Sequence, residues 1–570
     1  CAGTAVATRA VTLGLRAALG LAVAGQLFVL LGLAGALRPW SIGTLTVLVI
    51  AGGVYRWNRQ ERTRYQRGMV AGAIVSASPL FALALYPPTS FDETLYHLPF
   101  VRALARSGAI GFQPDLRFPI FPQLHEALCA PAFLALGDVA THLVALGELL
   151  ILVALLIDWP RDRRAGILAA ALALGNPIVV HLGTITYVDS ALTLFVAAGF
   201  YCLDRGCRAE GPAHSWRRRS RPLQAGEEHS PADNSGWYFA AAGLLLGSAC
   251  SVKYLGWYFA GAATLFVILF AANRRRAIPL FLVSLGAGVV PTYARIYTLT
   301  GNPLFPFLTG VFGSSQWRLD VTAKASLSTR ILWDITFGRE HLNQQPPYSP
   351  LFALGIILLL GVMFRSRRVA FLVALSGGYL AIFTLLPQDS RYLLPLLPLV
   401  SIATASAIAS WLASRGSGGV SIVVLSLLSI APGLAYAGYR LVRQGPPPLT
   451  AKARHIYLER HIPEYRALER RGPGRIYVCG AEQLKYFGGN DMIGDVSGPF
   501  ANEKLFGENR SAAALSPALA RLGVRYLLLS RRAGRPEWRR VPAPPQFERV
   551  YADDGAELWR LCGPLTVDSR

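Results

Sequence analysis

An acidic pair, Asp92-Glu93, stands in the segment 91–97 (FDETLYH), directly after the third long apolar run of the chain. At the edge of a membrane the local dielectric is low, which raises the pKa of a carboxyl group towards that of a useful general base. Tyr96 and His97 follow within one helical turn and are candidate substrate contacts. On spacing alone, two solvated loop acids are the simpler interpretation, so the pair needs support from other residues.

Three cations and a further acid stand where apolar runs meet short polar turns. They are Lys253, followed by Tyr254, in GSACSVKYLG; Arg391, followed by Tyr392, in PQDSRY; Arg117 in RFPIFPQ; and Asp189, at the end of GTITYVD. An interfacial lysine commonly extends to the membrane surface, and an acid at a helix start is commonly an N-cap. Fixed positive charge at headgroup depth also suits the phosphate of a lipid, which accounts for the three cations together.

The composition indicates a membrane protein with a more polar tail. Of 570 residues, 53% are hydrophobic and 16% charged, and the mean hydropathy is +0.38. These values exclude a disordered chain and an ordinary soluble one. The net charge of +23 comes largely from short arginine clusters between apolar runs, which orient helices, so nucleic acid is not an expected partner. Seven cysteines without CxxC spacing indicate no zinc site.

The apolar runs predict about 13 membrane spans. We expect them at 11–37, 41–55, 69–86, 139–157, 165–182, 187–203, 237–252, 254–272, 277–297, 348–364, 369–386, 392–413 and 420–440. With this set, all the arginine clusters (56–67, 161–164, 217–221, 274–276 and 365–368) fall on one side, which is then the cytoplasm.

Residues 120–136 are also apolar, but they contain His125 and Glu126, which are costly in lipid. We therefore expect an interfacial or re-entrant helix there. The outward stretches are then 87–136, 183–189, 300–347 and 387–391. The candidate residues lie in or beside these stretches, except Lys253 and Tyr254, which stand between the spans 237–252 and 254–272.

The chain divides into a transmembrane domain, 1–441, and an extracytoplasmic α/β domain, 442–570. In the second domain, 475–479 and 524–530 are typical of strands, and 481–487 of a helix. The segments 547–551 and 557–561 flank Asp-Asp-Gly at 553–555, which predicts a hairpin. The expected fold is mainly α: a polytopic helix bundle with a small C-terminal α/β domain.

Several of these motifs occur in an order that resembles a known family. FDETLYHLPFVRALARSG, RFPIFPQLHEALCAPAFLALGD, TYVDSALTLF, GLLLGSACSVKYLGW, GNPLFPF and DSRYLLPLLPL run in sequence between about residues 69 and 413. Together they resemble bacterial membrane glycosyltransferases of the GT-C superfamily, related to the protein O-mannosyltransferases and the lipid A aminoarabinose transferase. In those relatives the acidic pair follows the first span, whereas here it follows the third, which two extra N-terminal helices explain.

The resemblance implies an inverting transfer of a sugar from a polyprenyl-phosphate donor, on the outer face of the bacterial inner membrane, to a lipid, glycan or protein acceptor. A phosphate leaving group requires fixed cations, which Lys253, Arg391 and Arg117 supply. Asp92 is then the candidate base, and Glu93 and Asp189 orient the acceptor or the base. Some members use a divalent metal, but no His/Asp set in this sequence requires one. The sequence therefore requires no cofactor and leaves a divalent metal open.

A transporter or flippase of lipid-linked solutes is the main alternative, because it shares the polytopic body and the intramembrane cations. Transporters place charged residues near the midplane, in broken helices, whereas here the polar residues collect at the outer ends of spans. A membrane protein without catalysis, whose outer domain binds a partner, leaves the acidic pair and the cations unexplained. The sequence therefore favours an enzyme.

Overall fold

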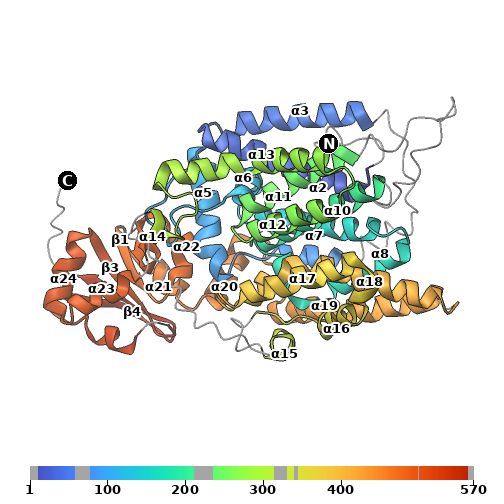
Figure 1. Ribbon diagram of the computed structural model, residues 1–570. Helices are drawn as coiled ribbons and strands as arrows, with labels where there is room; N and C mark the ends of the chain where they lie inside the picture. The colour runs from blue at the N-terminus through green and yellow to red at the C-terminus, as the bar shows by residue number, and fades with distance from the viewer. Residues whose placement is uncertain are drawn as a thin grey trace, which may run out of the picture.

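The computed structural model describes residues 11–57, 77–210, 235–312, 330–338, 345–416, 418–498, 500–533 and 535–562. An elongated helical body is joined at one end to a smaller domain of helices and strands (Figure 1). The helices of the body are α2 (Leu13–Leu33), α3 (Pro39–Trp57), a stretch at 77–84, η1 (Glu93–His97), α5 (Leu98–Ser107), α6 (Leu124–Leu136), α7 (Val139–Asp158), α8 (Arg163–Leu174), α9 (Pro177–Leu182), α10 (Asp189–Ala209), α11 (Ser235–Val252), α12 (Gly256–Phe270), α13 (Arg274–Thr300), α14 (Thr309–Phe312), α15 (Ile331–Phe337), α16 (Pro350–Val362), η5 (Met363–Arg365), α17 (Arg367–Phe383), η6 (Ser390–Leu396), α18 (Leu397–Ala413) and α19 (Gly418–Gln444).

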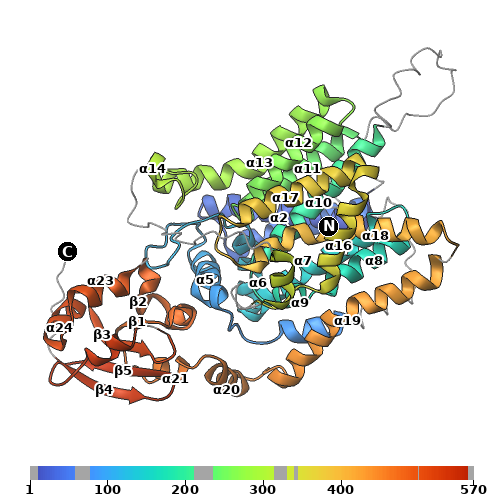
Figure 2. The same ribbon diagram turned by 60° about the horizontal axis from the view of Figure 1, so that its bottom comes forward.

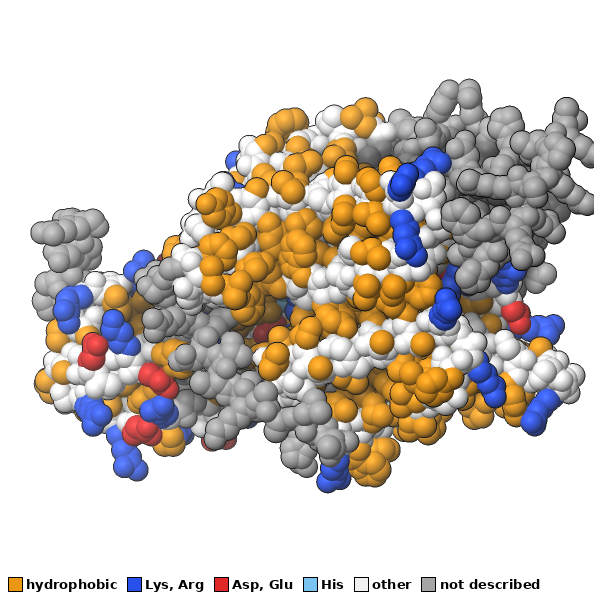
Figure 3. Space-filling view, viewed as in Figure 1, with side chains coloured by type: hydrophobic (Ala, Val, Ile, Leu, Met, Phe, Trp, Pro, Cys, Tyr) orange, Lys and Arg blue, Asp and Glu red, His pale blue; other side chains and the backbone are white. Residues whose placement is uncertain are grey.

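Within the described ranges, six helices are long and apolar enough to cross a bilayer: α2, α7, α11, α13, α18 and α19. Shorter apolar helices begin at Leu124, Gly256 and Pro350. Apolar side chains cover the visible face of the body, and Lys and Arg side chains follow its end away from the mixed domain (Figure 3). A polytopic membrane fold is therefore confirmed, whereas the number of 13 spans stays a prediction. The arginine cluster 217–221 and most of 56–67 lie outside the described residues.

The expected span 165–182 is two helices. Asn176 has an extended backbone, and Pro177 opens α9. The residue before a proline is disfavoured in the helical conformation, so α8 ends at this point. The side chain of Asn176 donates back to Leu172 O and accepts from the Ser349 N–H, which satisfies backbone groups that the break exposes.

Helix α6 lies within the segment 120–136, for which the sequence predicts an interfacial or re-entrant helix. Its first half, Leu124–Ala130, is buried in contact with α2, α5 and α7, while the residues after Pro131 become exposed. The polar residues that argued against a span in lipid, His125 and Glu126, are at most 1% exposed. Burial inside protein, with partners, removes the cost that these side chains would have in lipid.

The C-terminal part is a small α/β domain, as expected. The order of its sheet is β2-β1-β3-β5-β4, with β1 parallel to β2 and β3, and β5 antiparallel to β3 and β4. The short strand β2 was not expected, and the expected boundary at 441/442 falls inside the last turn of α19. The elements are α20 (Ala451–His461), α21 (Tyr465–Glu469), β1 (Arg475–Cys479), η7 (Glu482–Leu484), α22 (Lys485–Gly488), η8 (Gly489–Asp491), β2 (Met492–Gly494), η9 (Asp495–Ser497), α23 (Ala501–Glu508), α24 (Ala512–Arg521), β3 (Val524–Ser530), η10 (Pro536–Arg540), β4 (Phe547–Ala552) and β5 (Ala556–Leu561).

The two parts pack directly against each other at the start of η1 and α5 (Figure 2). Leu95 is buried in the same apolar cluster as Leu458, Ile462 and Leu484. Asp138, at the start of α7, accepts from the Arg454 guanidinium at 2.5 Å and the Tyr486 hydroxyl at 3.0 Å. The acidic pair therefore lies at the junction between the body and the C-terminal domain.

Candidate active site

Asp92 lies at the start of η1, a short π-helical turn between a loop and α5. Such turns are rare and occur frequently at functional sites. The backbone N–H of Asp92 donates to the Tyr187 hydroxyl at 3.1 Å, and its carboxylate contacts the Arg391 guanidinium at 2.5 Å. The turn thus aims one carboxylate of the pair at a cation that lies 299 residues away in sequence.

Arg391 is held between two carboxylates. Its Nη2 contacts Asp92, and its Nε lies 2.7 Å from the Asp389 carboxylate. Burial alone would raise the pKa of Asp92, but the Arg391 guanidinium outweighs this and holds that pKa below its ordinary value. The expectation of a raised pKa for Asp92 is therefore wrong for this state of the site, because the cation stabilises the ionised form.

Lys253 makes the second ion pair of the site. Its Nζ lies 2.9 Å from the Asp189 carboxylate at the start of α10, and 4.4 Å from the centre of the Tyr392 ring. The Arg391 guanidinium lies 4.9 Å from the Tyr187 ring and 5.4 Å from the Tyr392 ring. The Tyr392 ring therefore lies against both cations and the Tyr187 ring against Arg391, and these ring faces stabilise the positive charge of the two side chains. We call Asp92, Asp189, Lys253, Asp389 and Arg391 the ion cluster.

Glu93 has a different environment from Asp92. Its side chain is fully buried; Oε1 lies 2.6 Å from His142 Nε2 and accepts the Thr186 N–H at 2.8 Å, while Oε2 accepts the Ser90 N–H at 3.3 Å. His142 Nδ1 lies 3.2 Å from Ala84 O, a group that only accepts, so Nδ1 carries a proton. Glu93 therefore anchors the 183–189 turn to α7, and its role in orienting the acceptor or the base stays a prediction.

Two further His–Glu pairs lie beneath the site. His97 Nδ1 is 2.5 Å from Glu126, and His125 Nδ1 is 3.0 Å from Glu148, with all four side chains at most 3% exposed. Together with His142 and Glu93 they connect η1, α6 and α7. Sequence reasoning missed these pairs, as it missed Tyr187 and Asp389. The signal that was available was the presence of polar residues inside apolar runs, which require partners when buried.

The other predicted site residues lie at different distances from the ion cluster. The Tyr96 ring stacks 4.2 Å from His97, whose ring is 5.9 Å from Tyr187, so both flank the cluster. The Tyr254 hydroxyl donates to Phe305 O, beside Lys253. Arg117 lies near Glu482 and Asp495 of the C-terminal domain and not with the two other cations. Burial raises the pKa of both acids, and the positive charge of Arg117 offsets part of that rise.

An apolar groove of about 780 Å³ is lined at one point by Tyr254, which follows Lys253 in the chain. Its walls are aromatic and aliphatic side chains of α12, α13 and the segment 303–307. Several of these side chains, Trp257, Val290, Tyr297 and Phe307, are at least 40% exposed on the apolar surface of the body. The groove is therefore open towards the lipid and suits a hydrocarbon chain, whose head would then reach Lys253.

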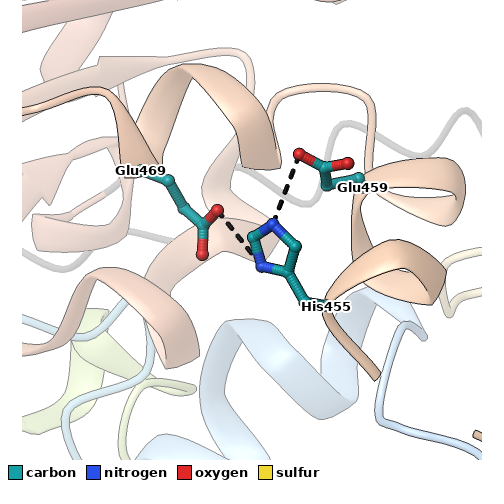
Figure 4. Close-up of side chains that lie close together, drawn as sticks. All are labelled: His455, Glu459 and Glu469. Carbon is teal, nitrogen blue, oxygen red and sulfur yellow. Dashed lines mark ion pairs between the residues drawn. The ribbon is translucent and has the colours of Figure 1, made fainter. Parts of the chain in front are cut away.

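The carboxylates of the ion cluster are paired with cationic side chains. Each of its three carboxylates already contacts a Lys or Arg side chain, and no histidine of the described residues contacts these carboxylates. Elsewhere in the described part of the chain, His455, Glu459 and Glu469 lie close together (Figure 4). The two ring nitrogens of His455 face different carboxylates: Nε2 lies 3.5 Å from Glu459 and Nδ1 lies 3.3 Å from Glu469. A single metal ion would bind only one nitrogen of the ring. This exposed group is an ion-paired bridge between α20 and α21.

Comparison with known proteins agrees with this arrangement. Residues 141–308, which include Asp189 and Lys253, match the family described as dolichyl-phosphate-mannose-protein mannosyltransferase. Residues 453–560 match a family named SF2091/S2213. A curated relative, the uncharacterized protein SF2093/S2215 of Shigella flexneri, is 37% identical over 123 residues, which are 20% of this chain and 61% of that protein. The chain thus spans about three fifths of that relative's length.

Two solved structures share the fold. ArnT from Cupriavidus metallidurans bound to undecaprenyl phosphate has a TM-score of 0.54 at 15% identity, over 88% of this chain and 100% of that one. Its apo form has a TM-score of 0.53 at 14% identity, over 87% and 99%. The expected resemblance to GT-C membrane glycosyltransferases is confirmed by this fold together with the matched segment 141–308. At 14–15% identity these two structures show the fold that the chain shares with them.

Proposed function

We propose that this protein transfers a sugar, with inversion, from a polyprenyl-phosphate donor to an acceptor on the outer face of the bacterial inner membrane. The observation that carries the proposal is the ion cluster at the head of an apolar groove. Asp92, Asp189, Lys253 and Arg391 come from four separate segments and meet next to a channel suited to a lipid chain. ArnT, which shares the fold, has been crystallised with undecaprenyl phosphate.

The donor would lie with its lipid chain in the groove and its phosphate between Lys253 and Arg391. When the sugar is transferred, the bond between its anomeric carbon and the phosphate oxygen breaks, and the electron pair stays on the phosphate. Negative charge develops at this oxygen, where the two fixed cations stabilise it. No general acid is needed, because a phosphate is already a good leaving group.

Asp92 is the proposed base. The acceptor hydroxyl attacks the anomeric carbon from the side opposite the phosphate, and its proton passes to the Asp92 carboxylate. In the free site this carboxylate is paired with Arg391, which weakens its basicity. A donor phosphate that competes for Arg391 would release Asp92 at the moment when a base is needed. Asp189 pairs with Lys253 in the free site and would be displaced from it by the donor phosphate in the same way. Asp389 keeps Arg391 in position.

The experiment is transfer by purified protein, supplied with a polyprenyl-phosphate sugar and a crude outer-leaflet acceptor. Asp92→Asn keeps the size of the side chain and removes its basicity, so transfer should fall about 10²- to 10⁴-fold while donor binding persists. The matched control is Asp115→Asn, an exposed acid in the same outer stretch. A flippase would form no glycosidic bond with wild-type protein. Robust transfer by Asp92→Asn would instead remove Asp92 from the role of base.

A further inference from the structure

Arg440 is a half-buried cation that has no carboxylate partner among the described residues. Its Nη1 donates to His181 Nδ1 and to Thr184 Oγ1, each at 3.3 Å. A guanidinium only donates, so His181 accepts at Nδ1 and its ring is neutral. Both partners are therefore uncharged, and the other N–H groups of Arg440 have no partner in the described structure.

The ion cluster makes this free charge significant. Its two cations, Lys253 and Arg391, are already shared among three carboxylates. With all five groups ionised, the cluster carries one net negative charge. Arg440 contacts the same 183–189 turn that Glu93 anchors through Thr186, and His181 lies within electrostatic reach of Glu93, Arg391 and Arg440. Within the described ranges, Arg440 is thus a positive charge without a carboxylate partner, beside a site that is otherwise slightly acidic.

Arg440 is not an ordinary interfacial arginine. An arginine that anchors a helix extends its head towards lipid headgroups and water. Arg443, in the next turn of α19, has this character, because its side chain is exposed and donates to the Tyr439 hydroxyl of its own helix. Arg440 turns inward instead, onto α9 and the turn after it. The chain therefore contains a matched pair, one arginine built into the site and one on the surface.

The position of Arg440 is across the site from the apolar groove. The groove is formed by α12 and α13, which pack with α11, whereas α19 packs on α8 and α9 at the opposite side of the body (Figure 2). Tyr86 and Tyr457, whose rings are 5.5 Å apart, lie within the field of Arg440 and connect this side to the C-terminal domain. A ligand group at Arg440 would approach Asp92 from the side away from the donor lipid.

We infer that Arg440, supported by His181 and Thr184, forms a second oxyanion-binding subsite that takes a phosphate or carboxylate group of a substrate. The inference rests on the proposed function and extends it to substrate class. Two sources share this chemistry: the donor phosphate and an acidic group on the acceptor. The position opposite the groove favours the acceptor.

The test compares Arg440→Gln with Arg443→Gln in lipid nanodiscs made of phosphatidylcholine. Inorganic phosphate is the first probe, measured by direct binding and by inhibition of transfer. In a Lys253→Ala background, where phosphate binding at the ion cluster is weakened, we expect Arg440→Gln to weaken the remaining binding of phosphate roughly 10- to 100-fold, since hydrogen bonds to a charged group are of that strength. Arg443→Gln should leave it unchanged, and Arg440→Lys should retain part of it. If Arg440→Gln does not accumulate, Arg440→Met, which keeps length without charge, replaces it.

The second probe is undecaprenyl phosphate, which separates the two sources. If Arg440→Gln binds it as the wild type does but requires more of a crude outer-leaflet acceptor, the oxyanion belongs to the acceptor. If its affinity for undecaprenyl phosphate falls instead, the oxyanion is that of the donor. Equal phosphate binding by Arg440→Gln and Arg443→Gln would overturn the subsite. Phosphate binding needs no turnover, so this failure differs from an absence of transfer by the wild type, which would contradict the proposed function.

Discussion

The buried ion pair between Glu93 and His142 predicts that Glu93 holds the site in place, whereas Asp92 takes part in the chemistry. The side chains of Glu93 and His142 are 0% and 2% exposed, and Oε1 of Glu93 lies 2.6 Å from His142 Nε2. Glu93→Gln removes the charge and places an amide N–H₂ group against either the Ser90 N–H or His142. We expect it to destabilise the protein while it leaves donor binding intact.

The magnitude follows from the contacts. Removing one partner of a buried ion pair costs about 3–5 kcal/mol, and a lost hydrogen bond at Ser90 about 1 kcal/mol more. His142→Gln removes the other partner and leaves Glu93 with two backbone N–H donors, so its cost should be about 3 kcal/mol. Because both changes remove the same pair, the double variant should cost less than the sum, by roughly 2 kcal/mol or more.

The assay is denaturant-induced unfolding in detergent micelles, followed by tryptophan fluorescence, together with transfer kinetics for each variant. The single variants should also lower kcat, with little change in KM for the donor, because Asp92 and the 183–189 turn lose their common anchor. Wild-type stability of Glu93→Gln, combined with loss of transfer as deep as that of Asp92→Asn, would refute the reasoning and give Glu93 a direct part in the chemistry. Additive costs in the double variant would show that the pair does not act as one unit.

Three other predictions concern the donor and the membrane. Lys253→Ala should weaken the binding of undecaprenyl phosphate in a filter-binding assay by roughly tenfold or more, and Lys253→Arg by much less, because the site requires charge; unchanged affinity in Lys253→Ala would make Lys253 an interfacial anchor. Ala294→Trp fills the groove, so it should raise KM for a long-chain donor more than for a donor with a shortened chain. An equal rise of KM for both donors would show that the groove does not hold the lipid chain. A cysteine at Ser107 should react with a membrane-impermeant thiol reagent in intact spheroplasts above the background of the parent chain, whereas one at Ser366 should not; equal labelling would contradict the proposed sidedness.

The sequence by itself determined the class of fold and much of the candidate site. Long apolar runs leave a chain few choices besides membrane helices, and the hairpin at 553–555 and the strands 475–479 and 524–530 follow from local pattern. Lys253, Arg391, Asp92 and Asp189 could be selected because charge at the end of an apolar run is costly and needs a reason. The resemblance to GT-C enzymes required only the order of short motifs.

The tertiary structure decided how these charges are used. Which acid neutralises which cation depends on contacts between residues up to 299 positions apart, and no local pattern encodes them. For this reason the pKa of Asp92 is lowered and not raised, Glu93 is an anchor held by His142, and Arg117 lies beside the C-terminal domain. The burial of His125 and Glu126 in α6 has the same origin: a polar residue inside an apolar run is unfavourable until a distant partner is supplied, and only the packed helices supply it.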